Sequence, residues 1–168
     1  HLGPVRLQAV RAVAVQSGDE AGQCAVHPGA ATAAAQTTAA SMDKLPLKKG
    51  AVILFQGDSI TDMKWGRNEE DRNHYLGHSY VFLIAARLGA DMPAVRLDFY
   101  NRGISGNTVA DLRQRWQKDA LAMKPDLLSI LIGTNDVGHG RQPTEFESDY
   151  RFILDASRAA DPGLKLVI

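Results

Sequence analysis

Several features that often indicate a protein's function are missing from this chain of 168 residues. It contains a single cysteine, Cys24, so an intrachain disulfide is excluded. It carries 19 basic and 19 acidic residues, and this balance argues against nucleic acid or an anionic membrane surface as the main partner. No stretch approaches the roughly 20 consecutive apolar residues of a transmembrane helix. Hydrophobic residues nevertheless make up 45% of the chain, which is enough for the core of one globular domain.

Residues 1–43 differ in composition from the rest and are rich in Ala, Gln, Thr, Gly and Val. We expect a leader, a linker or a disordered tail there, and a folded domain over residues 44–168. The Ala- and Thr-rich residues 30–40 resemble the end of a secretory signal and favour a secreted or periplasmic protein over a cytoplasmic one, although arginines interrupt the apolar segment that a signal needs. Residues 21–23 before Cys24 resemble a lipoprotein cleavage box, but no long apolar run precedes them.

The pattern from residue 45 onward alternates between apolar runs typical of buried strands and segments with helical periodicity. Strand, helix and strand follow one another throughout, which predicts the α/β class with a parallel sheet and helices on both faces. The expected strands are residues 51–55, 95–100, 127–132 and 164–168, and the expected helices are residues 75–88, 107–123 and 144–159.

Three polar loops follow the first three strands, at residues 57–62, 101–107 and 133–136. The carboxyl ends of parallel strands lie at one edge of the sheet, where ligands of such sheets bind. Ser59 offers a hydroxyl that can attack an ester carbonyl if a base removes its proton. The backbone N–H groups of Ser59 and Gly103 and the side-chain amide of Asn135 can stabilise the resulting oxyanion. The sequence therefore predicts acyl transfer at this edge.

These loops resemble the first three sequence blocks of the SGNH (GDSL-type) hydrolases, whose name stands for Ser, Gly, Asn and His. The matching residues are GDSI at 57–60, the glycine of NRGISGN at 101–107 and GTND at 133–136. The resemblance implies a three-layer α/β/α sandwich of the flavodoxin-like kind. It also implies Ser59 as nucleophile, Gly103 and Asn135 in the oxyanion hole, and neither cofactor nor metal.

The same resemblance suggests a substrate class. GDSITD followed by Trp65 and Arg67, together with DLRQRW and SILIGTND, looks most like esterases that remove acetyl groups from carbohydrates. A lysophospholipase, a thioesterase or a small-ester lipase would use the same catalytic residues. The expected partner is a small-molecule or carbohydrate ester, and the sequence does not determine the oligomeric state.

One block of the family pattern is missing, because no histidine follows His139. The family's base lies in a DxxH near the carboxyl terminus, after a fifth strand. The DxxH at residues 71–74 stands between the first strand and the first helix instead. The chain ends within the apolar run of residues 164–168, so we expect a truncated domain that lacks its last strand and helix. An inactive fragment or a non-catalytic binding domain is therefore the alternative to an esterase.

Several polar residues of these loops also have a purely structural interpretation. Ser59 could simply cap a helix, and Gly103 could be needed only for its backbone conformation. Asn135 could be a cap, while Asp58 and Asp136 suit the binding of loop N–H groups. Asp62 could cap the short turn after Ser59.

The remaining candidates are aromatic, basic or histidine side chains. Trp65 could either line the substrate cleft or cover the core, whereas Trp116 falls on the apolar face of its helix. Arg113 and Arg115 flank Trp116 and are expected to be solvated. His74 and His78 lack a third ligand at a spacing suited to a metal, and His139 is expected to be a solvated loop residue.

Overall fold

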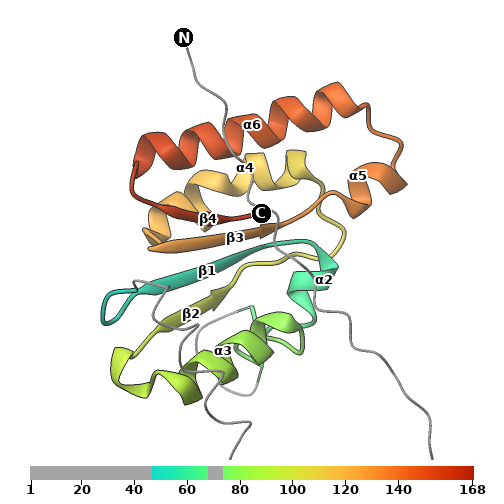
Figure 1. Ribbon diagram of the computed structural model, residues 1–168. Helices are drawn as coiled ribbons and strands as arrows, with labels where there is room; N and C mark the ends of the chain where they lie inside the picture. Colours follow the sequence, from blue (N-terminus) through green and yellow to red (C-terminus); the bar gives the residue numbers. More distant parts are fainter. Residues whose placement is uncertain (1–46, 68–73) are drawn as a thin grey trace, which may run out of the picture. The chain divides into compact units, whose positions relative to one another are not determined.

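The computed structural model describes residues 47–67 and 74–168, and residues 45–168 form one compact unit (Figure 1). The strands are β1 (Val52–Gly57), β2 (Asp98–Asn101), β3 (Leu127–Leu131) and β4 (Lys165–Val167). They form one sheet in the order β2-β1-β3-β4, and every pairing is parallel. The predicted α/β class with a parallel sheet is therefore confirmed. The leader or linker expected over residues 1–43 lies outside the described residues.

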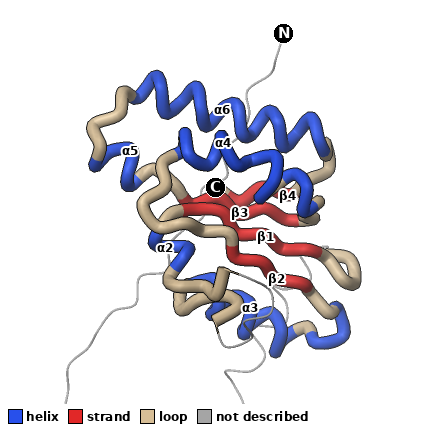
Figure 2. Tube along the Cα trace, turned by 180° about the vertical axis from the view of Figure 1, so that it is seen from behind, coloured by secondary structure: helices blue, strands red, loops and turns tan. Residues whose placement is uncertain are grey.

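Helices lie on both sides of the sheet, as Figures 1 and 2 show from opposite directions. The pair α4 (Val109–Asp119) and α6 (Pro143–Ala160) covers one face, and α3 (Tyr80–Asp91) covers the other. Consecutive strand residues point to opposite faces, so Leu54 joins the α4–α6 core while Ile53 joins the α3 core. The two cores make the three layers of the sandwich.

Two helices differ from their expected bounds because of local capping. α3 begins at Tyr80 rather than at residue 75, since the Ser79 hydroxyl accepts a hydrogen bond from the Val81 N–H at 3.2 Å. The end predicted at residue 88 is also wrong, because α3 continues through Gly89 to Asp91. The helix predicted over residues 107–123 begins after a Thr108 cap and ends at Asp119, where the 3₁₀ turn η2 (Leu121–Met123) follows. Another 3₁₀ turn, η1 (Pro93–Val95), precedes β2.

The sequence did not predict two short helices at the carboxyl ends of strands. α2 (Ser59–Asp62) follows β1, and α5 (Thr134–Gly138) follows β3. Each has only 4 or 5 residues, which is too short to leave a periodic apolar pattern. Both lie at the same end of the sheet in Figures 1 and 2, so the loops predicted to carry the chemistry share one edge.

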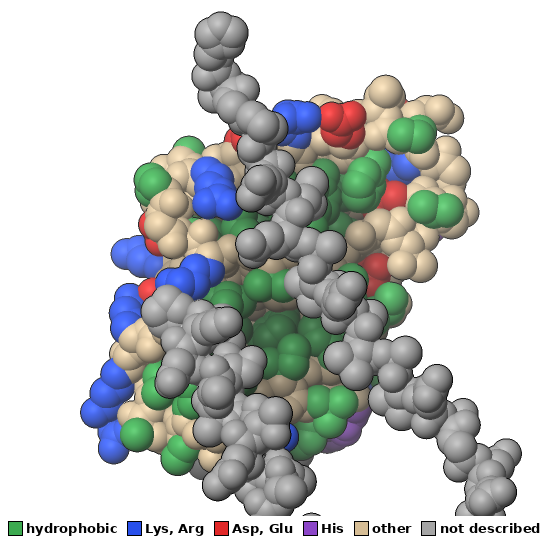
Figure 3. Space-filling model, viewed as in Figure 1, with side chains coloured by type: hydrophobic (Ala, Val, Ile, Leu, Met, Phe, Trp, Pro, Cys, Tyr) green, Lys and Arg blue, Asp and Glu red, His purple; other side chains and the backbone are tan. Residues whose placement is uncertain are grey.

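The α3 side of the sheet is less completely covered toward β3 and β4. Leu131 is 43% exposed and Val167 is 48% exposed, although their neighbours on the other face are buried or half-buried. Figure 3 shows hydrophobic side chains gathered in a hollow on the visible face, beside the atoms drawn in grey. The described residues therefore leave part of this apolar face open to solvent.

Candidate functional site

Two hydrogen bonds tie the three loops together at the carboxyl edge of the sheet. The Ile104 N–H donates to the Gly57 carbonyl at 3.0 Å, which joins the loop after β2 to the turn that carries Ser59. The Asn135 side chain donates through Nδ2 to the Asn107 carbonyl at 2.9 Å, which joins the same loop to α5. The residues that the sequence singled out thus belong to one connected site.

Ser59 is the first residue of α2 and is exposed. The buried Asp58 side chain caps this helix by accepting a hydrogen bond from the Ile60 N–H at 3.0 Å. The Ser59 N–H donates to no group among the residues that the structure describes. Both the hydroxyl and the N–H of Ser59 are therefore available to a ligand, while Asp58 has the structural role that the sequence predicts.

The backbone N–H of Gly103 is engaged, unlike that of Ser59. It donates to Oδ1 of the buried Asn101 side chain at 2.9 Å. A Cβ on Gly103 would lie 2.5 Å from the Asp62 backbone nitrogen, so close packing against α2, and not a positive φ, requires glycine here. To serve as an oxyanion donor, the Gly103 N–H would have to leave Asn101.

Gly106, which the sequence did not single out, lies in the same loop and has different surroundings. It is exposed, its φ is +84°, and a Cβ would meet nothing within 4 Å. Its N–H donates to no group in the described part of the chain. The motif NRGISGN contains both glycines, but the sequence alone does not show which of the two has an unengaged N–H.

These two glycines are expected to differ in their tolerance of alanine. Gly103→Ala forces two backbone segments apart and should lower the free energy of unfolding by about 3 kcal/mol. Gly106→Ala meets no neighbour and should lose only about 1 kcal/mol, from its left-handed conformation. Chemical denaturation of both variants measures the difference, and equal losses would contradict the packing of Gly103 against α2.

Asn135 is the second residue of α5, and its amide is oriented by the preceding loop. One Nδ2 hydrogen is bound to the Asn107 carbonyl, and the second remains available to a ligand. Asn107 is held in turn by Arg115, whose Nε donates to Asn107 Oδ1 at 2.9 Å. The neighbouring Asp136 is buried and accepts from the Val109 N–H at 3.0 Å, so it anchors the start of α4 as a structural residue.

Asp62 connects α2 to the loop after β2. Its Oδ2 accepts hydrogen bonds from the Arg67 guanidinium at 2.6 Å and from the Ser105 hydroxyl at 2.7 Å. Burial acts to raise the pKa of Asp62, but the hydrogen bonds from Arg67 and Ser105 outweigh it, so this pKa lies below its ordinary value. The sequence suggested that Asp62 caps a turn, whereas the structure shows that its side chain joins α2 to the loop after β2.

Asp62→Asn is expected to lower stability at neutral pH and to weaken its pH dependence. Because the folded pKa of Asp62 is depressed, its ionised form stabilises the fold above the unfolded value of about 3.9, and this stabilisation disappears as the pH falls through the folded pKa. We expect a loss of about 1–3 kcal/mol at neutral pH that shrinks below about pH 4. Urea denaturation across this range, with the exposed Asp155→Asn as a control, tests the prediction; a pH-independent difference would contradict it.

The described histidines lie apart from the hydrogen bonds of the Ser59 loop. His74, His78 and His139 are all exposed, and none of them hydrogen-bonds the Ser59 hydroxyl. The His74 and His78 rings contact each other edge to face at 5.7 Å. Asp71, the acidic residue of the DxxH motif at residues 71–74, lies outside the described residues. In residues 47–67 and 74–168, no group of three His, Cys, Asp or Glu side chains is arranged to hold a metal ion.

The two tryptophans are both buried, but they contact different parts of the molecule. Trp116 is 1% exposed and donates to the Ser157 hydroxyl at 3.1 Å, in agreement with the predicted core position. Trp65 is 8% exposed and donates to the Gly103 carbonyl at 2.7 Å. The expectation that Arg115 is solvated is wrong, because its side chain is only 15% exposed and lies against Asn107.

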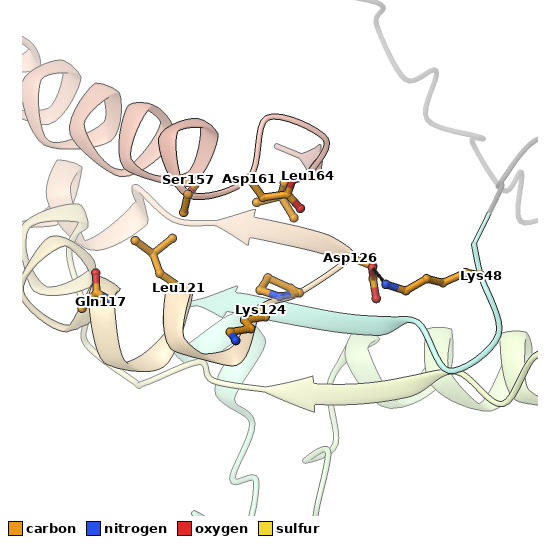
Figure 4. Close-up of a pocket in the computed structure, with 10 residues that line it drawn as sticks. Lys48, Gln117, Leu121, Lys124, Asp126, Ser157, Asp161 and Leu164 are labelled. Carbon is orange, nitrogen blue, oxygen red and sulfur yellow. Dashed lines mark ion pairs between the residues drawn. The ribbon is translucent and has the colours of Figure 1, made fainter.

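A cavity of about 520 Å³ lies at the opposite end of the sheet from Ser59 (Figure 4). It is bordered by the Lys48–Asp126 ion pair, with 2.6 Å between Nζ and Oδ1, and by Ser157 and Leu164. Asp126 directly precedes β3, so this cavity is near the amino ends of the strands. Ligands of parallel sheets bind beyond the carboxyl ends, and the cavity is therefore not the candidate active site.

Comparison with known proteins agrees with the geometry. The model of the GDSL-like lipase/acylhydrolase family matches residues 55–168. An acetylxylan esterase of Geobacillus stearothermophilus is 45% identical over 94 residues, which are 55% of this chain and 43% of that protein. An uncharacterised lipoprotein of Bacillus subtilis is 52% identical over 86 residues, which are 51% of this chain and 31% of that protein.

A solved structure from Parabacteroides merdae, described as a GDSL-like lipase, has a similar fold. The two structures superpose with a TM-score of 0.66 at 42% sequence identity. The match covers 71% of this chain and 59% of the Parabacteroides merdae chain. The chain thus spans less than half the length of the two curated relatives and about three-fifths of this structure.

Proposed function

The chain belongs to the GDSL-like lipase/acylhydrolase family, and we propose that it carries the nucleophile and the oxyanion donors of a serine ester hydrolase. The junction of the three loops supports this proposal most directly. The Gly57–Ile104 and Asn107–Asn135 hydrogen bonds bring an exposed serine hydroxyl and an oriented amide to one edge of the sheet. A nucleophile beside fixed donors is the arrangement that acyl transfer requires.

In the proposed reaction, Ser59 Oγ attacks the ester carbonyl carbon and a base takes the hydroxyl proton. The alcohol leaves with a proton from that base, and water then hydrolyses the acyl-serine to release the acid and restore Ser59. The Ser59 N–H and the Asn135 amide are the proposed donors to the oxyanion. For a third donor the sequence favours Gly103, whereas the exposed and unengaged N–H of Gly106 makes the latter the better candidate.

We propose that the base comes from outside the described histidines, because none of them hydrogen-bonds the Ser59 hydroxyl. We therefore expect the 168-residue chain alone to hydrolyse p-nitrophenyl acetate at neutral pH no faster than its Ser59→Ala variant. Covalent labelling of Ser59 by an alkyl fluorophosphonate at alkaline pH, where hydroxide can take the serine proton, tests the nucleophile itself. A chain that binds esters but never reacts at Ser59 would be the non-catalytic binding domain instead.

For the substrate, we propose an acetyl ester of a carbohydrate. The support is the resemblance of the Ser59 loop and the 45% identity to a protein named acetylxylan esterase. A lysophospholipase or a thioesterase is the alternative within the family. Protection of Ser59 from labelling separates them, because acetylated sugars should protect it at lower concentration than long-chain acyl esters, and the reverse order would favour the alternative.

We also propose that the protein is exported, on the basis of the Ala- and Thr-rich residues 30–40 and of the relative named as a lipoprotein. Among the described helices, none combines the length and the apolar character that crossing a bilayer requires. Cell fractionation tests this proposal, and recovery of the protein in the cytoplasm alone would contradict it.

A further inference from the structure

The segment that follows α2 has an unusual backbone. Met63, Lys64 and Arg67 have positive φ angles of 33°, 59° and 61°. Residues with a Cβ rarely adopt this left-handed conformation, and they keep it only where the surrounding contacts compensate for its cost. Strained residues cluster at functional sites, and the contacts of Arg67 show what its conformation achieves.

The Arg67 guanidinium joins α2 to the loop after β2. Its Nη2 donates to Asp62 Oδ2 at 2.6 Å, and its Nη1 donates to the Gly103 carbonyl at 3.1 Å. The same carbonyl accepts a hydrogen bond from Trp65 Nε1 at 2.7 Å, and the guanidinium carbon of Arg67 lies 5.0 Å from the centre of the Trp65 ring. Stacking on the indole restricts the guanidinium, whose planar fork presents donors to two acceptors at once. Arg67 therefore contacts both elements in a fixed geometry.

Asp62 extends this connection to Ser105. The Asp62 side chain is 1% exposed, and the oxygen that accepts from Arg67 also accepts from the Ser105 N–H at 2.8 Å and from the Ser105 hydroxyl at 2.7 Å. A buried carboxylate is costly unless a cation balances its charge, and Arg67 supplies that charge. We call the connected side chains of Arg67, Asp62 and Ser105 the Arg67 clamp.

The Arg67 clamp ends beside two of the groups proposed for the reaction. Asp62 is the last residue of α2, and Ser59 is the first residue of the same short helix. Ser105 directly precedes Gly106, whose exposed N–H donates to no group in the described ranges and is a proposed oxyanion donor. Such a donor lowers the barrier when it is held in place before the reaction. The clamp thus links the helix of the nucleophile to the residue that precedes the donor.

We propose that Arg67 is a positioning residue for ester hydrolysis, which holds the Gly106 N–H at a fixed place relative to Ser59 through Asp62 and Ser105. Arg67 acts through these residues and does not touch the reacting atoms. This inference rests on the proposed function for the roles of Ser59 and Gly106, and on the contacts of Arg67 for the clamp itself. The left-handed backbone at Arg67 is then the conformation that lets one guanidinium reach both α2 and the loop.

Arg67→Gly isolates the side chain, because glycine adopts the left-handed backbone without strain. Labelling of Ser59 by an alkyl fluorophosphonate is followed at a fixed alkaline pH and at several reagent concentrations. We expect the maximal labelling rate to fall about 10- to 100-fold, because reacting groups are displaced, while the half-saturating concentration stays within about twofold. Methylguanidinium at about 20 mM should raise the rate of this variant at least about threefold, whereas methylammonium should not, because only the planar ion replaces both hydrogen bonds.

The matched control is Arg87→Gln, which removes another arginine that pairs with an aspartate, Asp91 on α3. It should label at the rate of the unmodified chain. A second measurement needs no reaction at Ser59. Amide hydrogen exchange of Ser105, whose N–H is bound to Asp62, should be at least about tenfold faster in Arg67→Gly and unchanged in Arg87→Gln.

Four results would overturn the proposal. An unchanged labelling rate in Arg67→Gly, or an unchanged exchange rate of Ser105, would remove the positioning role. A higher half-saturating concentration at an unchanged maximal rate would make Arg67 a contact of the reagent, and equal rescue by methylammonium would leave only an effect of charge. If the unmodified chain is never labelled at Ser59, the proposed function fails, whereas the exchange rate of Ser105 still decides whether Arg67 holds the clamp.

Discussion

Replacing Ser59 with alanine is expected to abolish covalent labelling of the chain by an alkyl fluorophosphonate. The serine Oγ attacks phosphorus, the phosphorus–fluorine bond breaks and fluoride leaves, so a residue without a hydroxyl cannot react. Ser59 is exposed at the start of α2, and its own N–H is free to stabilise the developing negative charge. Intact-mass spectrometry with peptide mapping measures the labelling.

The matched control is Ser148→Ala, which removes an exposed serine of α6 and should react like the unmodified chain. Labelling that persists in Ser59→Ala, or that maps to another residue, would sink the assignment of the nucleophile. Circular dichroism of each variant excludes loss of fold as the cause of an absent label.

The pH dependence of this labelling identifies the base. Because no described histidine hydrogen-bonds the Ser59 hydroxyl, we expect hydroxide to act as the base, and the rate should rise about tenfold per pH unit between about pH 7 and about pH 9.5. Burial raises the pKa of Tyr80 above its usual value and that of Tyr150 to about 12, so both core tyrosines stay protonated in this range. A plateau above about pH 7 would instead indicate a histidine base, whose ordinary pKa is about 6.5. His74→Ala and His139→Ala would then identify it.

The second large effect is expected for Asn135→Ala, which should slow labelling of Ser59 by about 100-fold or more. Removing one preorganised donor to an oxyanion typically costs about 10²–10³ in rate, and the Asn107 carbonyl already orients the Asn135 amide at 2.9 Å. The rate is measured at a fixed alkaline pH, together with the midpoint of unfolding. The fold should be little affected, because α5 is short and the Asn135 amide makes this single hydrogen bond among the described residues.

Two further variants make this prediction specific. Asn135→Asp keeps the size of the side chain but replaces the donor with a negative charge, so it should be at least as slow as Asn135→Ala. Thr134→Ala, at the adjacent exposed position of α5, should label normally. If Asn135→Ala reacts at the rate of the unmodified chain, the amide is a structural cap, which was the simpler interpretation of this residue.

The local pattern of the sequence was sufficient for the architecture but not for the details of the site. Apolar runs such as residues 51–55 and 127–132 predicted buried strands, and their alternation with helices predicted a parallel sheet, because burial on both faces leaves a direct mark on composition. The first residue of α3 depends on the Ser79 cap, and its last residue depends on continuation of the helix past Gly89. Helix propensity alone determines neither of them. The short helices α2 and α5 have no repeat to detect.

The sequence by itself determined the parallel sheet and the positions of Ser59 and Asn135 at strand ends, because both follow from periodicity and from the order of the elements. Only the tertiary structure decided how the loops use their other residues. It showed that Gly103 packs on α2 with its N–H bound to Asn101, that Gly106 is exposed, and that Arg115 is half-buried beside Asn107. These contacts join residues distant in the chain, so their geometry depends on how the strands align and not on any local pattern.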